Sequence, residues 1–287
     1  MSTSQQSTAA PASMKPLSLC SNRDEPVFQV WDAMVAEARA IVKDEPAMEH
    51  LIEDVVLSRN GPGEALAARL SRRLAREDMP REKMEPLLAE IFAADPAVVY
   101  SAMRDLMAIA ERDAACSSPL EPLLFFKGFL ALTTYRASHH LWENGRRWLA
   151  LYLQSLSSEV FSVDIHPAAR IGCGILLDHA TSFVVGETAV IEDDVSILHE
   201  VTLGGTGKAS GDRHPIVRSG VLLGAGAKIL GRVEIGTGAK VGAGSVVLTD
   251  VPPHRTVAGV PAVIVGEAIE ENPAAAMNQK LDCRNQT

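Results

Sequence analysis

Apolar residues recur at every sixth position through the second half of the chain. The recurring positions are Ile165, Ile171, Leu177, Val185, Ile191, Ile197 and Leu203, then Leu223, Ile229, Ile235, Val241 and Val247. Glycine is too frequent over residues 172–266 for a helix, at about 1 kcal/mol each relative to alanine. The period is not the two-residue alternation of an ordinary strand either. It predicts hexads of one short strand and one turn, three to a triangular coil of about 18 residues, giving about five coils over 164–262.

The six-residue period is broken at two places. The step from Leu177 to Val185 is longer than six, which predicts two extra residues near Asp178 and His179. Residues 204–220 read GGTGKASGDRHPIVRSG, without the period, and predict a loop extruded from the coils. Loops on a rigid scaffold often carry function, so we expect the chemistry at these two breaks.

The first half of the chain has a helical pattern. Helices are predicted at 27–42, 48–57, 64–74, 84–94, 96–110 and 125–156, from apolar residues at three- and four-residue spacing and from proline and glycine breaks. We therefore expect a helical domain over 26–158 and a β-helix domain over 159–266 with the loop 204–220. The polar ends, 1–25 and 267–287, are expected to be a disordered tail and a flexible tail.

Composition and charge narrow the class of protein. The chain has 287 residues, 47% of them hydrophobic and 22% charged, which suits a globular protein. A net charge of −9 without a basic stripe argues against a nucleic-acid partner. The first residues lack the apolar core of a signal peptide, and no run of about 18 apolar residues predicts a membrane span. We expect a cytoplasmic protein without a membrane partner.

An Asp–His pair is the first candidate for chemistry. His179 follows Asp178 at the first break, and Asp164, fifteen residues earlier, is expected on a nearby turn and within reach. A histidine oriented by a carboxylate is the usual general base for a hydroxyl. A corner histidine that bonds only to backbone has the same spacing, and the residues alone do not decide between the two.

The loop holds a second candidate, Arg213 with His214. Arginine can bind a carboxylate with two hydrogen bonds, although a solvated charged loop is the simpler interpretation. Residues 204–208 (GGTGK) lack the full phosphate-loop motif, but their amides suit a phosphate or pantetheine group. Asp113 lies at the end of a predicted helix, and its position alone predicts a surface residue. No set of histidines makes a defensible metal site, and a three-histidine zinc site is the alternative.

Several segments, in this order along the chain, resemble one family, the bacterial serine O-acetyltransferases. The segments are 93–96 (AADP), 123–129 (LLFFKGF), 164–169 (DIHPAA), 177–181 (LDHAT), 184–190 (VVGETAV), 201–208 (VTLGGTGK), 211–215 (GDRHP), 224–231 (GAGAKILG), 242–247 (GAGSVV) and 258–262 (AGVPA). The resemblance covers about residues 27–266. A hexapeptide repeat alone is unspecific, whereas these motifs in this order are specific.

The resemblance implies a fold, a reaction and partners. The fold is an all-helical N-terminal domain followed by a left-handed parallel β-helix. The reaction transfers acetyl from acetyl-CoA to the L-serine hydroxyl, by direct attack without an acyl-enzyme, in the first step of cysteine biosynthesis. Neither a permanently bound cofactor nor a metal is implied. L-cysteine is the expected feedback inhibitor at the serine site. The β-helices are expected to form trimers, and the helical domains to pair trimers into hexamers and to contribute to the serine site.

The resemblance also implies roles for individual residues. His179 matches the catalytic base and Asp164 the carboxylate that orients it. The residues matching the serine and cysteine site are Asp113, Asp178, Arg213 and His214. The residues matching the acetyl-CoA groove are Gly205, Thr206, Ala225, Lys240 and Ala243.

Two features depart from the family pattern. Many members have Gln-Ser or His-His where this chain has His199-Glu200. Members that bind O-acetylserine sulfhydrylase insert a C-terminal isoleucine into it, and Thr287 lacks that aliphatic bulk, so we expect a weak complex or none. The alternatives to serine acetylation are an O-acetyltransferase for homoserine or a sugar, a metal-dependent hydratase on the same β-helix, and a non-catalytic scaffold.

Overall fold

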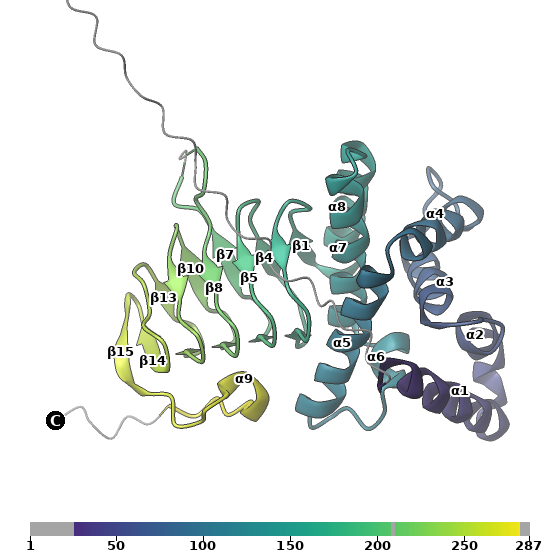
Figure 1. The fold of residues 1–287 in the computed structure, drawn as a ribbon, viewed down its shortest axis with the longest axis horizontal. Helices are drawn as coiled ribbons and strands as arrows, with labels where there is room; N and C mark the ends of the chain where they lie inside the picture. The colour runs from purple at the N-terminus through teal and green to yellow at the C-terminus, as the bar shows by residue number, and fades with distance from the viewer. Residues whose placement is uncertain (1–25, 208–209, 282–287) are drawn as a thin grey trace, which may run out of the picture.

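The computed structural model describes residues 26–207 and 210–281, which form a helical part and a β-helix side by side (Figure 1). The helices are α1 (Pro26–Asp44), α2 (Glu49–Ile52), α3 (Pro62–Leu74), α4 (Arg81–Ala94), α5 (Pro96–Arg112), α6 (Leu120–Leu124), α7 (Lys127–Glu143) and α8 (Arg147–Phe161), with short 3-10 and π turns at Pro46–Met48 and Glu53–Leu57. No single helix of the described residues is long and apolar enough to cross a membrane. One pair of helices, Arg81–Ala94 and Pro96–Arg112, is bent by 97° and is together long and apolar enough for a broken span, by length and composition only.

Helix ends follow local sequence signals. Proline occupies the first position of α3 and of α5, where its missing N–H costs nothing. Asp95 caps α5, accepting a hydrogen bond from the Ala97 amide at 3.1 Å. The long helical run expected at 125–156 is two helices, α7 and α8, which are separated at Gly145 with a φ of 73°. Left-handed backbone at that position favours glycine and ends the helix.

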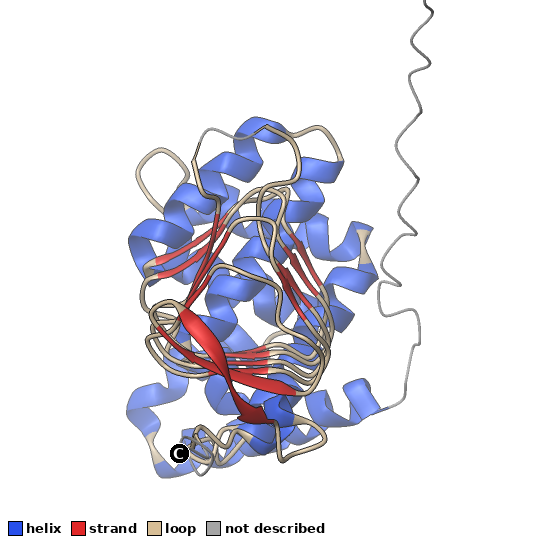
Figure 2. Ribbon diagram, turned by 90° about the vertical axis from the view of Figure 1, so that its left-hand side faces the viewer, coloured by secondary structure: helices blue, strands red, loops and turns tan. Residues whose placement is uncertain are grey.

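The β-helix consists of three sheets around a triangular core (Figure 2). Sheet A contains β1 (Val163–Ile165), β4 (Phe183–Val185), β7 (Thr202–Gly204), β10 (Lys228–Leu230) and β13 (Val246–Val247). Sheet B contains β2 (Arg170–Ile171), β5 (Val190–Ile191), β8 (Ile216–Val217) and β11 (Glu234–Ile235). Sheet C contains β3 (Leu176–Leu177), β6 (Ser196–Ile197), β9 (Leu222–Leu223), β12 (Lys240–Val241), β14 (Arg255–Gly259) and β15 (Ala262–Glu267). All pairs are parallel except β14–β15.

The hexad residues fill the triangular core, as predicted. Ile191, Ile197 and Leu203 are fully buried. Strands of successive regular coils pair in an eighteen-residue register, as Ile229 does with Val247. Burial of these aliphatic side chains is the main force that holds the coils together.

The register locates both breaks in the coil. Val163 pairs with Phe183, twenty positions on, so two extra residues lie between β3 and β4, as predicted. Val190 pairs with Ile216, twenty-six positions on, so the loop inserts eight residues. The loop runs from 205 to 215 and is shorter than the expected 204–220. Val217 is fully buried and resumes the period, which the flanking proline and arginine obscured in the sequence.

Residues 267–287 were expected to be a flexible tail, and the described part of this segment instead packs on the β-helix. The short helix α9 (Pro273–Ala276) buries Ala274, whose carbonyl accepts a hydrogen bond from Ser196 Oγ at 2.8 Å. Lys240 Nζ donates to the Lys280 carbonyl at 2.5 Å. The segment therefore covers the outer face of sheet C (Figure 1). Residues 1–25 and 282–287, including Thr287, lie outside the described residues, so predictions about them remain predictions.

A buried ion pair fixes the helices to the first coil. Arg136 of α7 lies 2.7 Å from the Asp105 carboxylate of α5 and donates to the Gly172 carbonyl at 2.6 Å. The other oxygen of Asp105 accepts from the Ile175 amide at 2.9 Å. Burial raises the pKa of Asp105 to about 6, although the charge of Arg136 and hydrogen bonds from Arg136 and from the Ile175 and Gly174 amides lower it. These donors offset part of the cost of the buried charge.

Candidate functional site

The two breaks lie on two different corners of the triangular coil. The histidine corner joins sheet C to sheet A and comprises residues 178–182, 198–201, 224–227 and 242–245. The loop corner joins sheet A to sheet B and comprises residues 166–169, 186–189, 205–215 and 231–233. Sheet A lies between the two corners, so the predicted residues form two groups, the candidate half-sites, at opposite ends of the sheet A strands.

The inserted residues of the histidine corner have an unusual backbone. His179, Ala180 and Ser182 have φ values of 54°, 61° and 60°, a left-handed conformation that costs non-glycine residues roughly 1–2 kcal/mol each. The first turn of α7 holds this segment. A side chain at Gly128 would overlap the Leu177 carbonyl, and Lys127 Nζ donates to Thr181 Oγ1 at 2.6 Å. The helical part thus supports the segment that presents His179.

The histidine corner brings three of the predicted residues together. The His179 side chain is 76% exposed, and its Nε2 lies 3.8 Å from Asp178 Oδ1. Burial raises the pKa of Asp178, the charge of His179 lowers it, and the nearby Asp113 carboxylate raises it again. Two carboxylates and an imidazole at one surface suit a ligand with a positive charge.

His199 is a neighbour of His179 to which the sequence assigned no role. The two rings are 5.8 Å apart in an edge-to-face arrangement. Nδ1 of His199 is buried and has no hydrogen-bond partner among the described residues. Such atoms are uncommon in folded proteins.

Among the described residues, Asp164 is hydrogen-bonded to helix α8 and not to His179. It lies in the middle of β1 and accepts a hydrogen bond from Gln154 Nε2 of α8 at 2.7 Å. No hydrogen bond or ion pair of the described residues joins it to His179. Asp164 pairs with Val184, so the two extra residues place His179 five positions before the residue that stacks on Asp164. His179 is therefore at the corner and not beside Asp164 in sheet A, which is why the expected contact is not seen within one chain.

The loop corner holds His214 by several hydrogen bonds. The Thr188 amide donates to His214 Nδ1 at 3.1 Å, and Thr188 Oγ1 accepts from the Arg213 and His214 amides at 3.0 and 3.2 Å. The His214 ring is 8% exposed and lies where a side chain at Gly186 would be. Because an amide can only donate, Nδ1 is an acceptor and the proton is on Nε2. Burial and the charge of Arg213 lower the pKa of His214, so it is a neutral donor.

Arg213 is oriented by a carboxylate that sequence reasoning missed. Its Nη2 lies 2.6 Å from Glu187 Oε2, and this hydrogen bond lowers the pKa of Glu187. Glu187 and Thr188 lie within a recognised motif, but as part of a repeat they gave no sign of facing the loop. Only the extra length of the loop, which must fold back onto a neighbouring turn, could have indicated them.

The five positions predicted for acetyl-CoA are divided between three places. Gly205 and Thr206 belong to the loop corner. Ala225 and Ala243 belong to the histidine corner, where the Gly244 amide donates to the Ala225 carbonyl at 2.8 Å. Lys240 is in sheet C, 4% exposed beneath the C-terminal segment. Within residues 26–207 and 210–281 of one subunit, the five positions therefore lie on two corners and one sheet.

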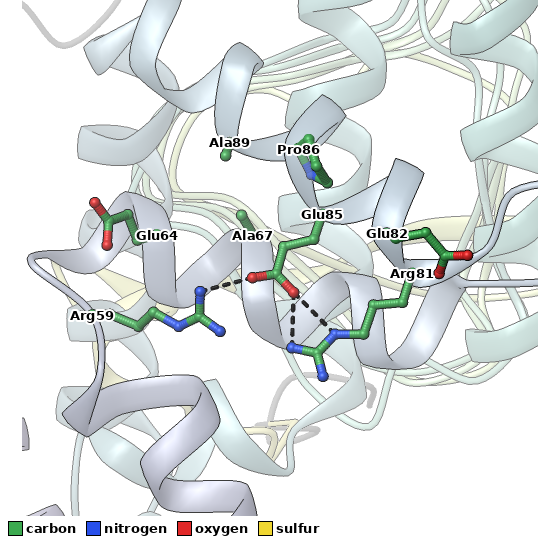
Figure 3. A pocket seen from close by; sticks show the side chains of 8 residues that line it. All are labelled: Arg59, Glu64, Ala67, Arg81, Glu82, Glu85, Pro86 and Ala89. Atoms are coloured by element: carbon green, nitrogen blue, oxygen red, sulfur yellow. Dashed lines mark hydrogen bonds and ion pairs between the residues drawn. The ribbon is translucent and has the colours of Figure 1, made fainter.

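Two pockets of the described residues lie away from the predicted site residues. A pocket of about 640 Å³ in the helical part is lined by charged side chains that pair with one another, such as Arg59 and Arg81 with Glu85 (Figure 3). A pocket of about 860 Å³ lies between α5, α7 and sheet B. Over residues 26–207 and 210–281, no group of three His, Cys, Asp or Glu side chains could hold a metal ion.

The chain is similar to known proteins over most of its length. Residues 30–134 match the family model "Serine acetyltransferase, N-terminal", and residues 214–249 match "Bacterial transferase hexapeptide (six repeats)". The serine acetyltransferase of Salmonella typhimurium is 54% identical over 253 residues, covering 88% of this chain and 93% of that protein. The one from Escherichia coli K12 is 52% identical, covering 90% and 94%.

Solved structures show the same similarity. Serine acetyltransferase from Vibrio cholerae has a TM-score of 0.87 at 51% identity, covering 88% of this chain and 98% of that one. A serine acetyltransferase in complex with cysteine has a TM-score of 0.87 at 48% identity, covering 89% and 99%. The Brucella abortus enzyme in complex with coenzyme A has a TM-score of 0.82 at 48% identity, covering 83% and 96%.

Proposed function

The chain belongs to the serine acetyltransferase family, and from this membership we propose how its two half-sites act together. Its reaction transfers the acetyl group of acetyl-CoA to the hydroxyl of L-serine, and L-cysteine is its feedback inhibitor. Because acetyl-CoA is the co-substrate, we place the reaction in the cytoplasm. The observation that supports the proposal is the position of the half-sites at opposite ends of the sheet A strands.

In this proposal, the complete site forms between two subunits of a trimer. The C-terminal segment covers part of sheet C, whereas sheet A exposes the apolar side chain of Val184, which is 37% exposed. If sheet A of each subunit faces the three-fold axis, the histidine corner of one subunit meets the loop corner of the next. Asp164 then orients His179 only if a neighbouring subunit supplies it. Pairing of two trimers through the helical parts completes a hexamer.

The loop corner recognises the serine carboxylate, and the histidine corner its amine. The Arg213 guanidinium can form two parallel hydrogen bonds with a carboxylate, and Glu187 already sets its direction. Asp178 and Asp113 carry negative charge in a half-buried place, which an ammonium group neutralises. This pair of recognition elements selects an α-amino acid over a sugar.

The chemical step is a direct transfer with His179 as base. His179 takes the serine hydroxyl proton as the oxygen attacks the thioester carbon, a role worth roughly 10²–10⁴ in rate. The carbonyl oxygen becomes an oxyanion, which backbone N–H groups of the site can stabilise, while the neutral Nε2–H of His214 donates to the serine carboxylate. The C–S bond then breaks, and the proton passes from His179 to the leaving CoA sulfur. The groove for CoA is built from Gly205 and Thr206 of one subunit and Ala225 and Ala243 of the next, with Lys240 nearby.

Mixing two inactive variants tests whether the site is shared. His179→Ala and Arg213→Ala subunits are co-expressed with different tags, and hetero-oligomers are isolated by both tags. Every trimer that carries both tags has one intact pair of corners among its three sites, so thiol release from acetyl-CoA should recover to about a third of wild type. In a hexamer of two randomly mixed trimers the expected recovery is about a quarter. Each variant alone is the control. Mixed oligomers no more active than the variants alone would place both corners in the same subunit.

A further inference from the structure

The turn at Gly231 and Arg232 supports the first residues of the loop 205–215. This turn lies between β10 and β11, one coil beyond β7, on the loop corner. The Gly231 amide donates to the Gly204 carbonyl at 2.9 Å. Gly231 has a φ of 94°, and a Cβ there would be 3.2 Å from Thr206 Cγ2. Glycine therefore allows the first residues of the loop to lie directly on this turn.

The Arg232 side chain holds the end of the same loop. Its Nη1 donates to the His214 carbonyl at 3.1 Å and to the Thr188 carbonyl at 3.2 Å. Its Nη2 lies 3.3 Å from Asp212 Oδ2. The side chain is 29% exposed, so its bonds are only partly shared with water. One guanidinium thus joins the loop to Thr188, the residue that holds the Arg213 and His214 amides.

The described residues of the loop, 205–207 and 210–215, have few other attachments that could fix the serine-binding residues. None of them has a strand partner, and beyond the first two residues their bonds to the coils run mainly through Thr188, Glu187 and Arg232. Side chains held loosely must be ordered when ligand binds, and that cost reduces affinity. A donor that fixes the carbonyl of His214 therefore lowers the cost of binding at Nε2 of the same residue.

We propose that Arg232 is a positioning residue for serine and for its competitor cysteine, acting through His214 and Thr188 and not through contact with either ligand. The proposal rests on the proposed function, because it takes Arg213 and His214 as the groups that meet the amino acid. The attachment at Gly231 is backbone and does not depend on the Arg232 side chain. Arg232 should therefore affect the amino acid and leave acetyl-CoA binding unchanged.

Steady-state kinetics of Arg232→Ala test this assignment. A hydrogen bond from a charged donor is worth about a factor of ten, so the KM for serine and the inhibition constant for cysteine should each rise about tenfold. The kcat and the KM for acetyl-CoA should stay at wild-type values. Arg232→Lys keeps the charge and one donor position, and should give an intermediate KM. Arg218→Ala is the matched control, since Arg218 pairs with Glu192 and Glu234 away from the loop and should change no constant.

Two results would overturn the proposal, and both differ from failure of the proposed function. An unchanged KM for serine in Arg232→Ala, while Arg213→Ala raises it, removes the positioning role and leaves the function intact. An equal rise in both KM values, with a lowered melting temperature, assigns Arg232 to general stability. If Arg213→Ala itself leaves the KM for serine unchanged, the proposed function fails first. Should Arg232→Ala not fold, Arg232→Gln, which is shorter than arginine and uncharged, replaces it in the same measurements.

Discussion

The histidine corner and the loop corner border the same sheet but hold their key side chains in opposite ways. His179 is 76% exposed and has one weak ion-pair contact, whereas His214 is 8% exposed and has its Nδ1 fixed by the Thr188 amide. In the proposed trimer, the neighbouring subunit supplies the carboxylate that orients the base, so a single subunit leaves the His179 ring exposed. A recognition group gains from being oriented before the ligand arrives. The difference in burial thus follows the difference in task.

Removal of the base should have the largest effect. His179→Ala should lower kcat by roughly 10²–10⁴-fold, the usual contribution of a general base, and leave acetyl-CoA binding intact because the CoA positions lie on other residues. Thiol release measures kcat, and calorimetry measures CoA binding. His50→Ala, an exposed histidine of α2, is the control. Turnover near the wild-type value would exclude His179 as the base and remove the contrast between the corners.

The sequence predicted the regular part of this molecule better than the irregular part. The hexads identified the inward residues, because Ile197 or Leu203 can be buried in only one register of the coil. The two extra residues at Asp178 were also found from spacing. Val217 was missed because the period stops for the loop before it and because Pro215 and Arg218 flank it, although Val217 itself is buried.

The spacing of residues in the sequence could not predict how the side chains at the two corners are arranged. Asp164 and His179 are fifteen residues apart, but Asp164 is in the middle of β1 and His179 is at a corner. The order of residues does not reveal this difference. Glu187 and Thr188 act on a loop twenty-five and more residues away, through hydrogen bonds that depend on how the loop folds back. The packing of 267–281 was missed since its polar composition does not reveal that Ala274 and Lys280 meet sheet C.

Loss of the loop guanidinium should have the next largest effect, on substrate binding. Arg213→Ala should raise the KM for serine by about ten- to a hundredfold, the worth of one or two charged hydrogen bonds, with a smaller change in kcat. Glu187→Gln keeps a hydrogen-bond acceptor and should raise KM less, since it disturbs only the direction of Arg213. Initial rates at varied serine give both values. Equal changes in KM and kcat would show that Arg213 acts in the transition state as well as in recognition.

The smallest effect is expected far from both corners, and it concerns stability alone. Asp54 lies within 2.9 Å of Arg59 and 2.7 Å of Arg72 and Arg81. Burial raises the pKa of Asp54, but the hydrogen bonds from Arg81 and Arg72 outweigh it and lower this pKa to about 2. A carboxyl with a lowered folded-state pKa stabilises the protein above its unfolded pKa of about 3.9, and that contribution is lost as the pH falls towards 2.

Asp54→Asn should therefore lower the free energy of unfolding by about 1 kcal/mol at neutral pH, a value reduced by solvent screening. The difference from wild type should shrink as the pH falls from 4 towards 2, since the wild-type carboxyl is protonated there as well. Urea unfolding at several pH values measures it, with the exposed Glu49→Gln as control. The kinetic constants should not change, because the network does not contact either corner. A raised KM for serine in Asp54→Asn would mean that the helical part transmits strain to the site, and the contrast between the two corners would then not be local to sheet A.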